Sequence, residues 1–233
     1  MSFVLCRPQT ATSAVRIGLM TTMKGSAVPP RSVVIRWGNS DTCDGAEREV
    51  NKRAAVALAA DKMAALVKLE SAGVKVPKLY VEGEAVESGM TVVHRPRFHS
   101  EGSDFTVRSG PFTVPVGYYG TKLITPANEY RLWFFGNSTL TAKRMPMRSK
   151  GQSEADVCRS SWGYQFRPPF RQMMEIGKKV KSTIGLDFGA IDFLWHTTER
   201  KWYVLEVNSA PSLDHSQVRT MALSYFGSQA VFE

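Results

Sequence analysis

The sequence predicts an α+β protein, because β-hairpin patterns and helical patterns are interspersed along the chain. Residues 129–144 and 186–208 each contain two runs of β-type residues joined by a turn or a polar connector, as hairpins do. Residues 46–72 are rich in Ala, Leu, Lys and Glu, which favour helices. Residues 170–184 place apolar side chains three or four positions apart, which predicts a helix with one buried face.

Length and composition are those of a globular chain. With 233 residues, 43% of them hydrophobic, the chain can build one large domain or two small ones. No apolar run reaches the roughly 18–20 residues of a transmembrane helix, and the opening residues lack a cleavable signal pattern. The cysteines Cys6, Cys43 and Cys158 are an odd number without metal-type spacing, so we expect a reducing, cytoplasmic setting and no membrane association.

The net charge of +9 indicates a polyanionic partner without identifying it. A nucleoside triphosphate, a nucleic acid and an acidic peptide all fit the sign of the charge. The Lys and Arg residues are dispersed and are not interleaved with aromatic residues on a recognisable nucleic-acid-binding module. A nucleic-acid partner is therefore not favoured.

Two acidic residues interrupt the apolar strands of the hairpin predicted at residues 186–208. If the turn is centred near Glu199, Asp192 lies directly opposite Glu206. Like charges that face each other across two strands are destabilising, and a divalent cation between them would reverse that effect. Together with the amide oxygen of Asn208 they form an all-oxygen set suited to Mg²⁺. The alternative is a surface hairpin with incidental acids.

The segments GLDFGAIDF and LEVNSAPSL of this hairpin resemble the metal-binding end of the ATP-grasp fold. Glutathione synthetase, D-alanine–D-alanine ligase and the ligases that add glutamate to a ribosomal protein share this fold. The likeness is greatest to short carboxylate–amine ligase-like members from phage and bacterial genomes, and it covers roughly residues 36–214. It implies two lobes that clasp ATP, with Asp192, Glu206 and Asn208 holding the magnesium ions of Mg-ATP.

The resemblance also divides the chain into three parts. Residues 1–45 would be a truncated N-terminal segment, residues 46–124 the first ATP-grasp lobe, and residues 125–233 the second lobe with the metal site. Relatives usually begin with a whole α/β domain that helps to bind the acceptor. Here Arg36 and Asn39 would line the cleft or lie in a solvated loop.

The first lobe supplies the phosphate contacts that the resemblance implies. Lys62, in the helix predicted from residue 46 to 72, matches the lysine that reaches the ATP phosphates. Arg95 stands where the family has a lysine, and its guanidinium should still bind phosphate. A loop with one glycine follows, in which the backbone amides of Ser100 and Gly102 would contact the β- and γ-phosphates.

The strand predicted at residues 116–124 ends at the hinge that the resemblance implies between the lobes. There the backbone groups of Thr121, Lys122 and Leu123 would pair with adenine. Glu129, just after the hinge, would hold the ribose hydroxyls.

Two arginines of the next predicted hairpin would face the cleft. Arg131 shares a face with Glu129, and Arg144 lies on the returning strand. Two clustered arginines would repel each other unless an anion lay between them. Residues 148–171 are expected to form an irregular loop beside the site, and residues 214–233 a closing helix and tail.

The resemblance implies an ATP-dependent carboxylate–amine ligase that forms an amide or peptide bond through an acyl phosphate. Arg131 and Arg144 would be its catalytic cations, and ATP and Mg²⁺ its cofactors. The substrates would be a carboxylate and an amine, with a peptide or protein terminus among the candidates, and a homo-oligomer is compatible with the sequence. The alternatives are a nucleotide-binding regulator that has lost ligation and a basic nucleic-acid-binding protein.

Overall fold

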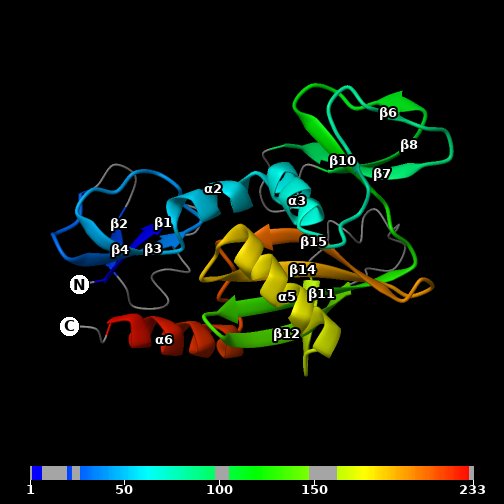
Figure 1. Ribbon diagram of the computed structural model, residues 1–233. Helices are drawn as coiled ribbons and strands as arrows, with labels where there is room; N and C mark the ends of the chain where they lie inside the picture. Colours follow the sequence, from blue (N-terminus) through cyan, green and yellow to red (C-terminus); the bar gives the residue numbers. More distant parts are fainter. Residues whose placement is uncertain (1, 7–19, 23–26, 98–104, 147–161, 231–233) are drawn as a thin grey trace.

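The computed structural model describes residues 2–6, 20–22, 27–97, 105–146 and 162–230 (Figure 1). Helices and sheets both contribute to it, so the α+β prediction is confirmed. The described helices are α2 (Arg53–Ala60), α3 (Lys62–Ser71), α5 (Arg171–Ile184) and α6 (Ser216–Ala230). Among the residues described, no helix is long and apolar enough to cross a membrane.

The N-terminal part forms a parallel sheet with the strand order β2-β1-β3-β4. Its strands are β1 (Ser2–Cys6), β2 (Met20–Thr22), β3 (Ser32–Trp37) and β4 (Ala46–Val50). Inside this sheet the Arg36 side chain is 1% exposed and pairs with the carboxylate of Glu49 on β4. It also donates to the carbonyl oxygens of Asn39 and Asp41, at 3.3 and 2.6 Å. Arg36 and Asn39 are therefore buried, and they lie neither in a solvated loop nor on an open cleft wall.

The single helix predicted from residue 46 to 72 is wrong in two places. Its first five residues form β4, because Val50 is buried where β4 pairs with Ile35 of β3. The remaining residues form two helices that break at Asp61, whose side chain accepts from the Ala64 N–H at 3.0 Å and caps α3. Strand pairing and capping thus override a helical propensity that is only a weak preference.

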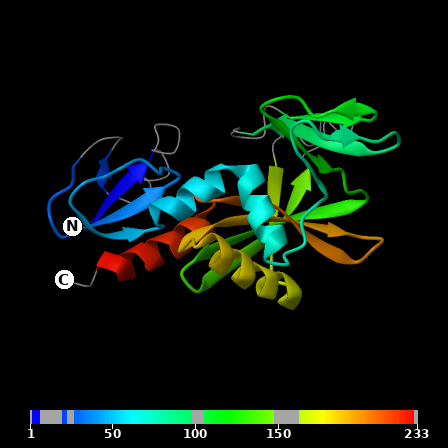
Figure 2. The same cartoon turned by 45° about the horizontal axis from the view of Figure 1, so that its top comes forward.

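The next part is a small antiparallel sheet with the order β5-β10-β7-β8. Its strands are β5 (Leu79–Tyr80), β7 (Thr91–Pro96), β8 (Thr106–Ser109) and β10 (Tyr118–Lys122), and a ribbon of β6 (Ala85–Val86) and β9 (Phe112–Thr113) lies beside it. The strands predicted near residues 91–97 and 116–124 are confirmed as β7 and β10. Figure 2 shows α2 and α3 bridging the N-terminal sheet and this small sheet.

The largest sheet is antiparallel, with the order β13-β12-β11-β14-β15. Its strands are β11 (Ala127–Phe135), β12 (Ser138–Pro146), β13 (Trp162–Arg167), β14 (Phe188–His196) and β15 (Lys201–Asn208). Both predicted hairpins are confirmed, as β11–β12 and β14–β15. Residues 162–167 form the edge strand β13, so that part of the irregular loop predicted for residues 148–171 is wrong, while residues 148–161 lie outside the described residues.

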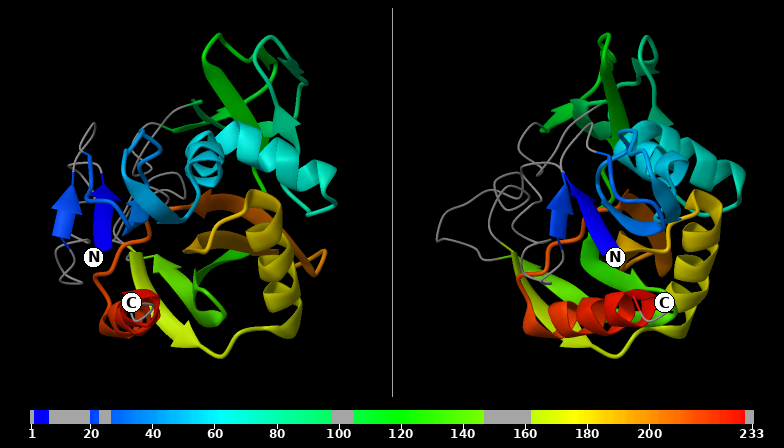
Figure 3. Two further views of the ribbon diagram at one scale, coloured as in Figure 1. Left: turned by 60° about the vertical axis from the view of Figure 1, so that its left-hand side comes forward. Right: turned by 90° about the vertical axis from the view of Figure 1, so that its left-hand side faces the viewer.

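Two clusters of buried apolar side chains cover the two faces of this sheet. Along β11, Leu132 and Phe134 point to the face packed by α2, α3 and α5. Trp133 and Phe135 point to the opposite face, where α6 and β3 pack. Figure 3 shows α5 and α6 on opposite sides of the sheet. The predicted apolar stripe of α5 and the predicted closing helix, α6, are thereby confirmed.

Asn51 joins the N-terminal sheet to the large sheet. It has a positive φ of 63° and is fully buried between β4 and α2. Its amide oxygen accepts from the backbone N–H groups of Asp187 and Phe188 at 2.7 and 3.1 Å, and its amide nitrogen donates to the Phe188 carbonyl at 3.0 Å. Its own N–H donates to the Asp187 carboxylate at 2.7 Å. This one side chain therefore satisfies three backbone groups at the start of β14.

We expect Asn51→Ala to lower the free energy of unfolding by about 3–5 kcal/mol, because it leaves buried backbone groups without partners. Asn51→Gly loses the same side-chain bonds but tolerates the positive φ, so it should be about 1 kcal/mol more stable than the alanine variant. Denaturant titrations of the three proteins measure both differences. A glycine variant as stable as the wild type would show that the side-chain hydrogen bonds contribute nothing.

Candidate active site

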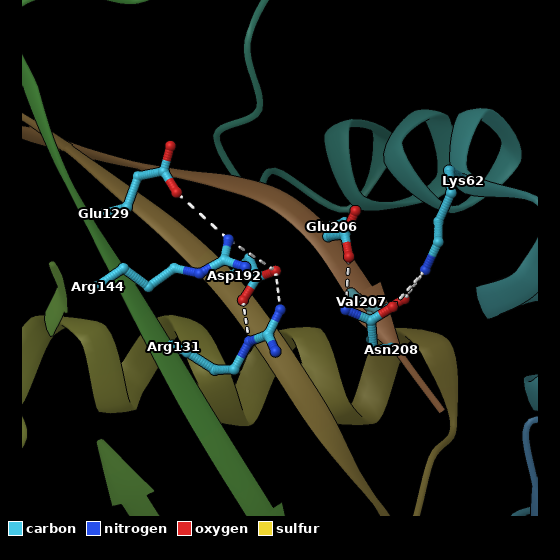
Figure 4. A network of polar contacts seen from close by, with 8 residues as sticks. All are labelled: Lys62, Glu129, Arg131, Arg144, Asp192, Glu206, Val207 and Asn208. Carbon is cyan, nitrogen blue, oxygen red and sulfur yellow. Dashed lines mark hydrogen bonds and ion pairs between the residues drawn. The ribbon is translucent and has the colours of Figure 1, made fainter. Parts of the chain in front are cut away.

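Polar and charged side chains gather on one half of the face that α6 and β3 cover elsewhere. Along β11 the positions that follow Phe135 and Trp133 on this face are Arg131 and Glu129. Arg131 lies opposite Asp192 on β14, and Asp192 lies opposite Glu206 on β15. The register of two neighbouring strand pairs therefore sets three charged side chains in one row across the sheet (Figure 4). The facing of Asp192 and Glu206 predicted from the sequence is present.

Arg131 compensates the charge of Asp192 directly. Its Nε and Nη2 atoms donate to the two carboxylate oxygens, at 2.5 and 2.6 Å, in a bidentate pair. The side chains are only 13% and 5% exposed. Burial alone would lower the pKa of Arg131, but the adjacent Asp192 carboxylate more than offsets this and raises it. Arg131 therefore stays charged and holds Asp192 in one orientation.

Arg144 reaches the same carboxylate from β12, which pairs with β11 on the side away from β14. Its Nη1 atom lies 3.3 Å from Glu129 Oε2 and 3.6 Å from Asp192 Oδ2. Burial opposes the charge of Arg144, and the Asp192 carboxylate outweighs it and raises the pKa of Arg144. Burial raises the pKa of Glu129, although Arg144 acts in the opposite direction. The two predicted cleft arginines thus converge on one carboxylate, and this carboxylate offsets their mutual repulsion.

Lys62 approaches Glu206 through Asn208. Its Nζ atom donates to the Val207 carbonyl at 2.7 Å and to Asn208 Oδ1 at 2.8 Å, and Asn208 Nδ2 donates to Glu206 Oε1 at 2.5 Å. Burial lowers the pKa of Lys62 despite the nearby Glu206 and Asp192. Burial would raise the pKa of Glu206, but the Lys62 charge and the Asn208 hydrogen bond bring it down to about 2. The Glu206 carboxylate is therefore ionised at neutral pH.

The small sheet contributes Arg95 and Tyr119, which lie opposite each other on β7 and β10. The charge of Arg95 acts on both Glu206 and Lys62, so Arg95 belongs to the same electrostatic cluster. Its Nε atom is buried without a hydrogen-bond partner among the described residues. Tyr119 is buried, which raises its pKa to about 12, and its ring centre lies 5.9 Å from the Arg95 guanidinium. Sequence reasoning missed Tyr119, because only the β7–β10 register places it beside Arg95.

The predicted adenine hinge lies at the end of β10, where the chain leaves the small sheet for β11. The Lys122 N–H donates to the Lys78 carbonyl at 2.8 Å, and the Leu123 N–H donates to the Thr91 carbonyl at 2.9 Å. These two amides already donate to carbonyl oxygens of the protein, so pairing with adenine through them would require breaking those bonds.

The remaining predicted ATP contacts of the chain before residue 125 are Ser100, Gly102 and Thr121. Ser100 and Gly102, predicted to contact the phosphates, lie outside the described residues. Thr121, the third predicted hinge residue, is buried within β10, between β5 and β7.

The chemistry of Asp192, Glu206 and Asn208 fits a magnesium ion. Two facing carboxylates and an amide oxygen are donors that Mg²⁺ accepts, with phosphate or water at its other positions. Within the described residues no group of three His, Cys, Asp or Glu side chains could hold a metal, so a site here needs the Asn208 oxygen. That oxygen accepts from Lys62, and the amide nitrogen faces Glu206.

No protein-family model matches the chain, and no curated protein matches it. Solved structures do. The ATP-grasp ligase PsnB, complexed with a phosphomimetic variant of a minimal precursor, Mg and ADP, matches at a TM-score of 0.67 and 11% identity, over 98% of this chain and 97% of PsnB. The macrocyclase MdnC from Microcystis aeruginosa, bound with the precursor peptide MdnA, matches at a TM-score of 0.57 and 12% identity, over 98% of this chain and 100% of MdnC.

The D-Ala:D-Ser ligase VanG from Enterococcus faecalis matches at a TM-score of 0.61 and 13% identity, over 85% of this chain and 73% of VanG. The chain also spans 26% of a much longer Rhizobium etli pyruvate carboxylase. These likenesses define the class of fold. It is an ATP-grasp fold, as predicted from the segments GLDFGAIDF and LEVNSAPSL of the β14–β15 hairpin. The arrangement of the layers is shared although about nine residues in ten differ.

The lowered pKa of Glu206 predicts a specific loss of stability in acid. The carboxylate stabilises the folded state fully above its ordinary pKa of 4.5, and this contribution is lost as the pH falls toward about 2. Between pH 5 and pH 3 the free energy of unfolding of the wild type should fall by about 2 kcal/mol more than that of Glu206→Gln. Denaturant titrations at the two pH values measure this difference. Glu70→Gln, at an exposed position of α3, is the control and should follow the wild type. If the free energy of unfolding falls equally in all three proteins, the pKa of Glu206 is not lowered in the folded state.

Proposed function

We propose that the protein is an ATP-dependent carboxylate–amine ligase that forms an amide or peptide bond through an acyl phosphate. One observation carries the proposal: on an ATP-grasp fold, Asp192 and Glu206 face each other and are surrounded by cations. The cations are Lys62 and Arg95 from residues 46–124 and Arg131 and Arg144 from the β11–β12 hairpin. Such a cluster suits a substrate that brings several negative charges.

Asp192, Glu206 and Asn208 would hold magnesium in this proposal. The metal would draw charge from the phosphate oxygens and so make the γ-phosphorus more electrophilic. The cluster has four cationic side chains and three carboxylates, so it carries one formal positive charge before any ligand binds. A nucleoside triphosphate would therefore be attracted to it. Arg95, whose Nε has no hydrogen-bond partner among the described residues, would be the phosphate contact from the first lobe.

The two arginines of the β11–β12 hairpin have different roles in this proposal. Arg131 is fixed by both nitrogens on Asp192, which suits a residue that positions a metal ligand. Arg144 makes longer contacts, at 3.3 and 3.6 Å, with Glu129 and Asp192. Its guanidinium is therefore the better candidate to stabilise the charge that develops on the acyl phosphate and on the tetrahedral intermediate.

The substrates we propose are a peptide or protein carboxylate and an amine. PsnB was solved with a minimal precursor and MdnC with a precursor peptide, and this chain matches both along almost their whole length. The net charge of +9 favours an acidic peptide. A cytoplasmic location agrees with the use of ATP and with the odd number of cysteines. The oligomeric state stays a prediction.

The test of the function is an ATP-turnover screen against acidic peptides and amino acids. We expect ADP release that requires both Mg²⁺ and a substrate. The product should have the summed mass of the carboxylate and amine substrates minus one water. EDTA should abolish tight ATP binding, measured by calorimetry. ATP binding that is equal with and without metal would remove the metal site, and binding without any product over the whole screen would favour the regulator.

Arg144→Ala separates a ligase from a regulator. We expect ATP affinity to change by only a few-fold, while turnover falls by about 10²–10³, the effect of losing one donor to a transition-state charge. Lys143→Ala is the matched control, because it removes a cation from the adjacent residue of β12, which points to the opposite face. If Arg144→Ala weakens ATP binding and turnover in equal proportion, Arg144 is an ordinary nucleotide contact.

A further inference from the structure

Lys62 occupies a place that the sequence did not predict. The resemblance assigns it to the ATP phosphates, but its ammonium group lies against β15, where it contacts two oxygens of the metal-binding segment. These are the Val207 carbonyl oxygen and the side-chain oxygen of Asn208, at 2.7 and 2.8 Å. Figure 4 shows the side chain reaching from α3 toward these two oxygens.

The contact fixes the orientation of the Asn208 amide. Because Oδ1 accepts from Lys62, Nδ2 must point the other way, and it donates to Glu206 at 2.5 Å. An amide nitrogen carries hydrogens and cannot ligate a metal. In this orientation Asn208 therefore presents a donor, not a ligand, to the side where Glu206 faces Asp192.

The positive charge of Lys62 also offsets the negative charge of the two carboxylates, as a bound metal ion would. The charged groups that act on it are Glu206 and Asp192, which attract it, and Arg131 and Arg95, which repel it. Arg131 is engaged by Asp192 through two nitrogens, and Lys62 is the cation that reaches Glu206 through Asn208. Removing Lys62 would leave that carboxylate without its main compensating charge.

From these contacts we infer that Lys62 is a built-in cation that holds the Asn208 oxygen, and so keeps Asn208 from ligating a metal beside Glu206, until nucleotide arrives. The inference rests on the proposed function, because it concerns the metal site of that function. Bound phosphate offers the ammonium group a second partner, which frees Asn208 to turn its oxygen toward Glu206. Nucleotide and metal would then bind cooperatively, since each favours the state in which Lys62 has left Asn208.

The test measures Mn²⁺ binding to the protein alone, followed by the signal of free Mn²⁺ in electron paramagnetic resonance. We expect Lys62→Met to bind Mn²⁺ at least about tenfold more tightly than the wild type, because it removes one charge-assisted hydrogen bond that competes for Asn208. Lys68→Met is the matched control: Lys68 is exposed on the same helix, and its loss should leave the affinity unchanged. Glu206→Gln in the Lys62→Met background should abolish the gain and so locate the metal.

A second measurement concerns cooperativity. ADP should increase Mn²⁺ affinity more in the wild type than in Lys62→Met, because the variant has no ammonium group to displace. Lys62→Gln, which keeps a polar side chain, replaces Lys62→Met if the latter does not fold, as judged by circular dichroism, and should behave in the same way.

The outcomes separate the inference from the proposed function. If the wild type binds Mn²⁺ with ADP but the Lys62 variants bind Mn²⁺ alone equally or more weakly, Lys62 supports the metal ligands and the inference is wrong. If the wild type does not bind Mn²⁺ even with ADP, the metal site fails, and the proposed function and the inference fall together.

Discussion

The structure around the site depends on how two facing carboxylates are compensated. Asp192 and Glu206 are paired across β14 and β15, and like charges at such positions repel each other. Each carboxylate is stabilised by a different cation: Arg131 binds Asp192 from the neighbouring strand, and Lys62 acts on Glu206 through Asn208 from a helix. Loss of either cation would leave a buried carboxylate without its main compensating charge, which is among the costliest changes to a folded protein.

The apolar packing explains why these charges can be held in a protected place. Alternation along β11 sends Leu132 and Phe134 to the face under α5, and Trp133 and Phe135 to the face under α6. The second face is apolar only as far as Trp133, and beyond it the same alternation presents Arg131 and Glu129. One strand thus anchors two hydrophobic layers and begins the polar site, so errors in its register would disrupt both together.

The sequence predicted what local pattern controls and missed what distant contacts control. The facing of Asp192 and Glu206 follows from alternation and a short turn, and both properties can be read along one segment. The helix predicted from residue 46 failed because β4 forms by pairing with β3, which helical propensity does not register. The partners of the carboxylates were missed for the same reason: Arg131 is 61 residues from Asp192, and Lys62 is 146 residues from Asn208.

The two compensating cations differ in kind, and this difference divides the site into a fixed half and an exchangeable half. Arg131 carries a planar guanidinium that matches the Asp192 carboxylate at two points, so rotation of either group breaks two hydrogen bonds at once. Lys62 carries a compact ammonium group on a flexible stem, and its two acceptors are uncharged oxygens. An incoming anion can compete for such a group, because it offers a full negative charge where the protein offers only dipoles. The half of the site that contains Glu206 and Asn208 is therefore the half that can reorganise when a ligand arrives.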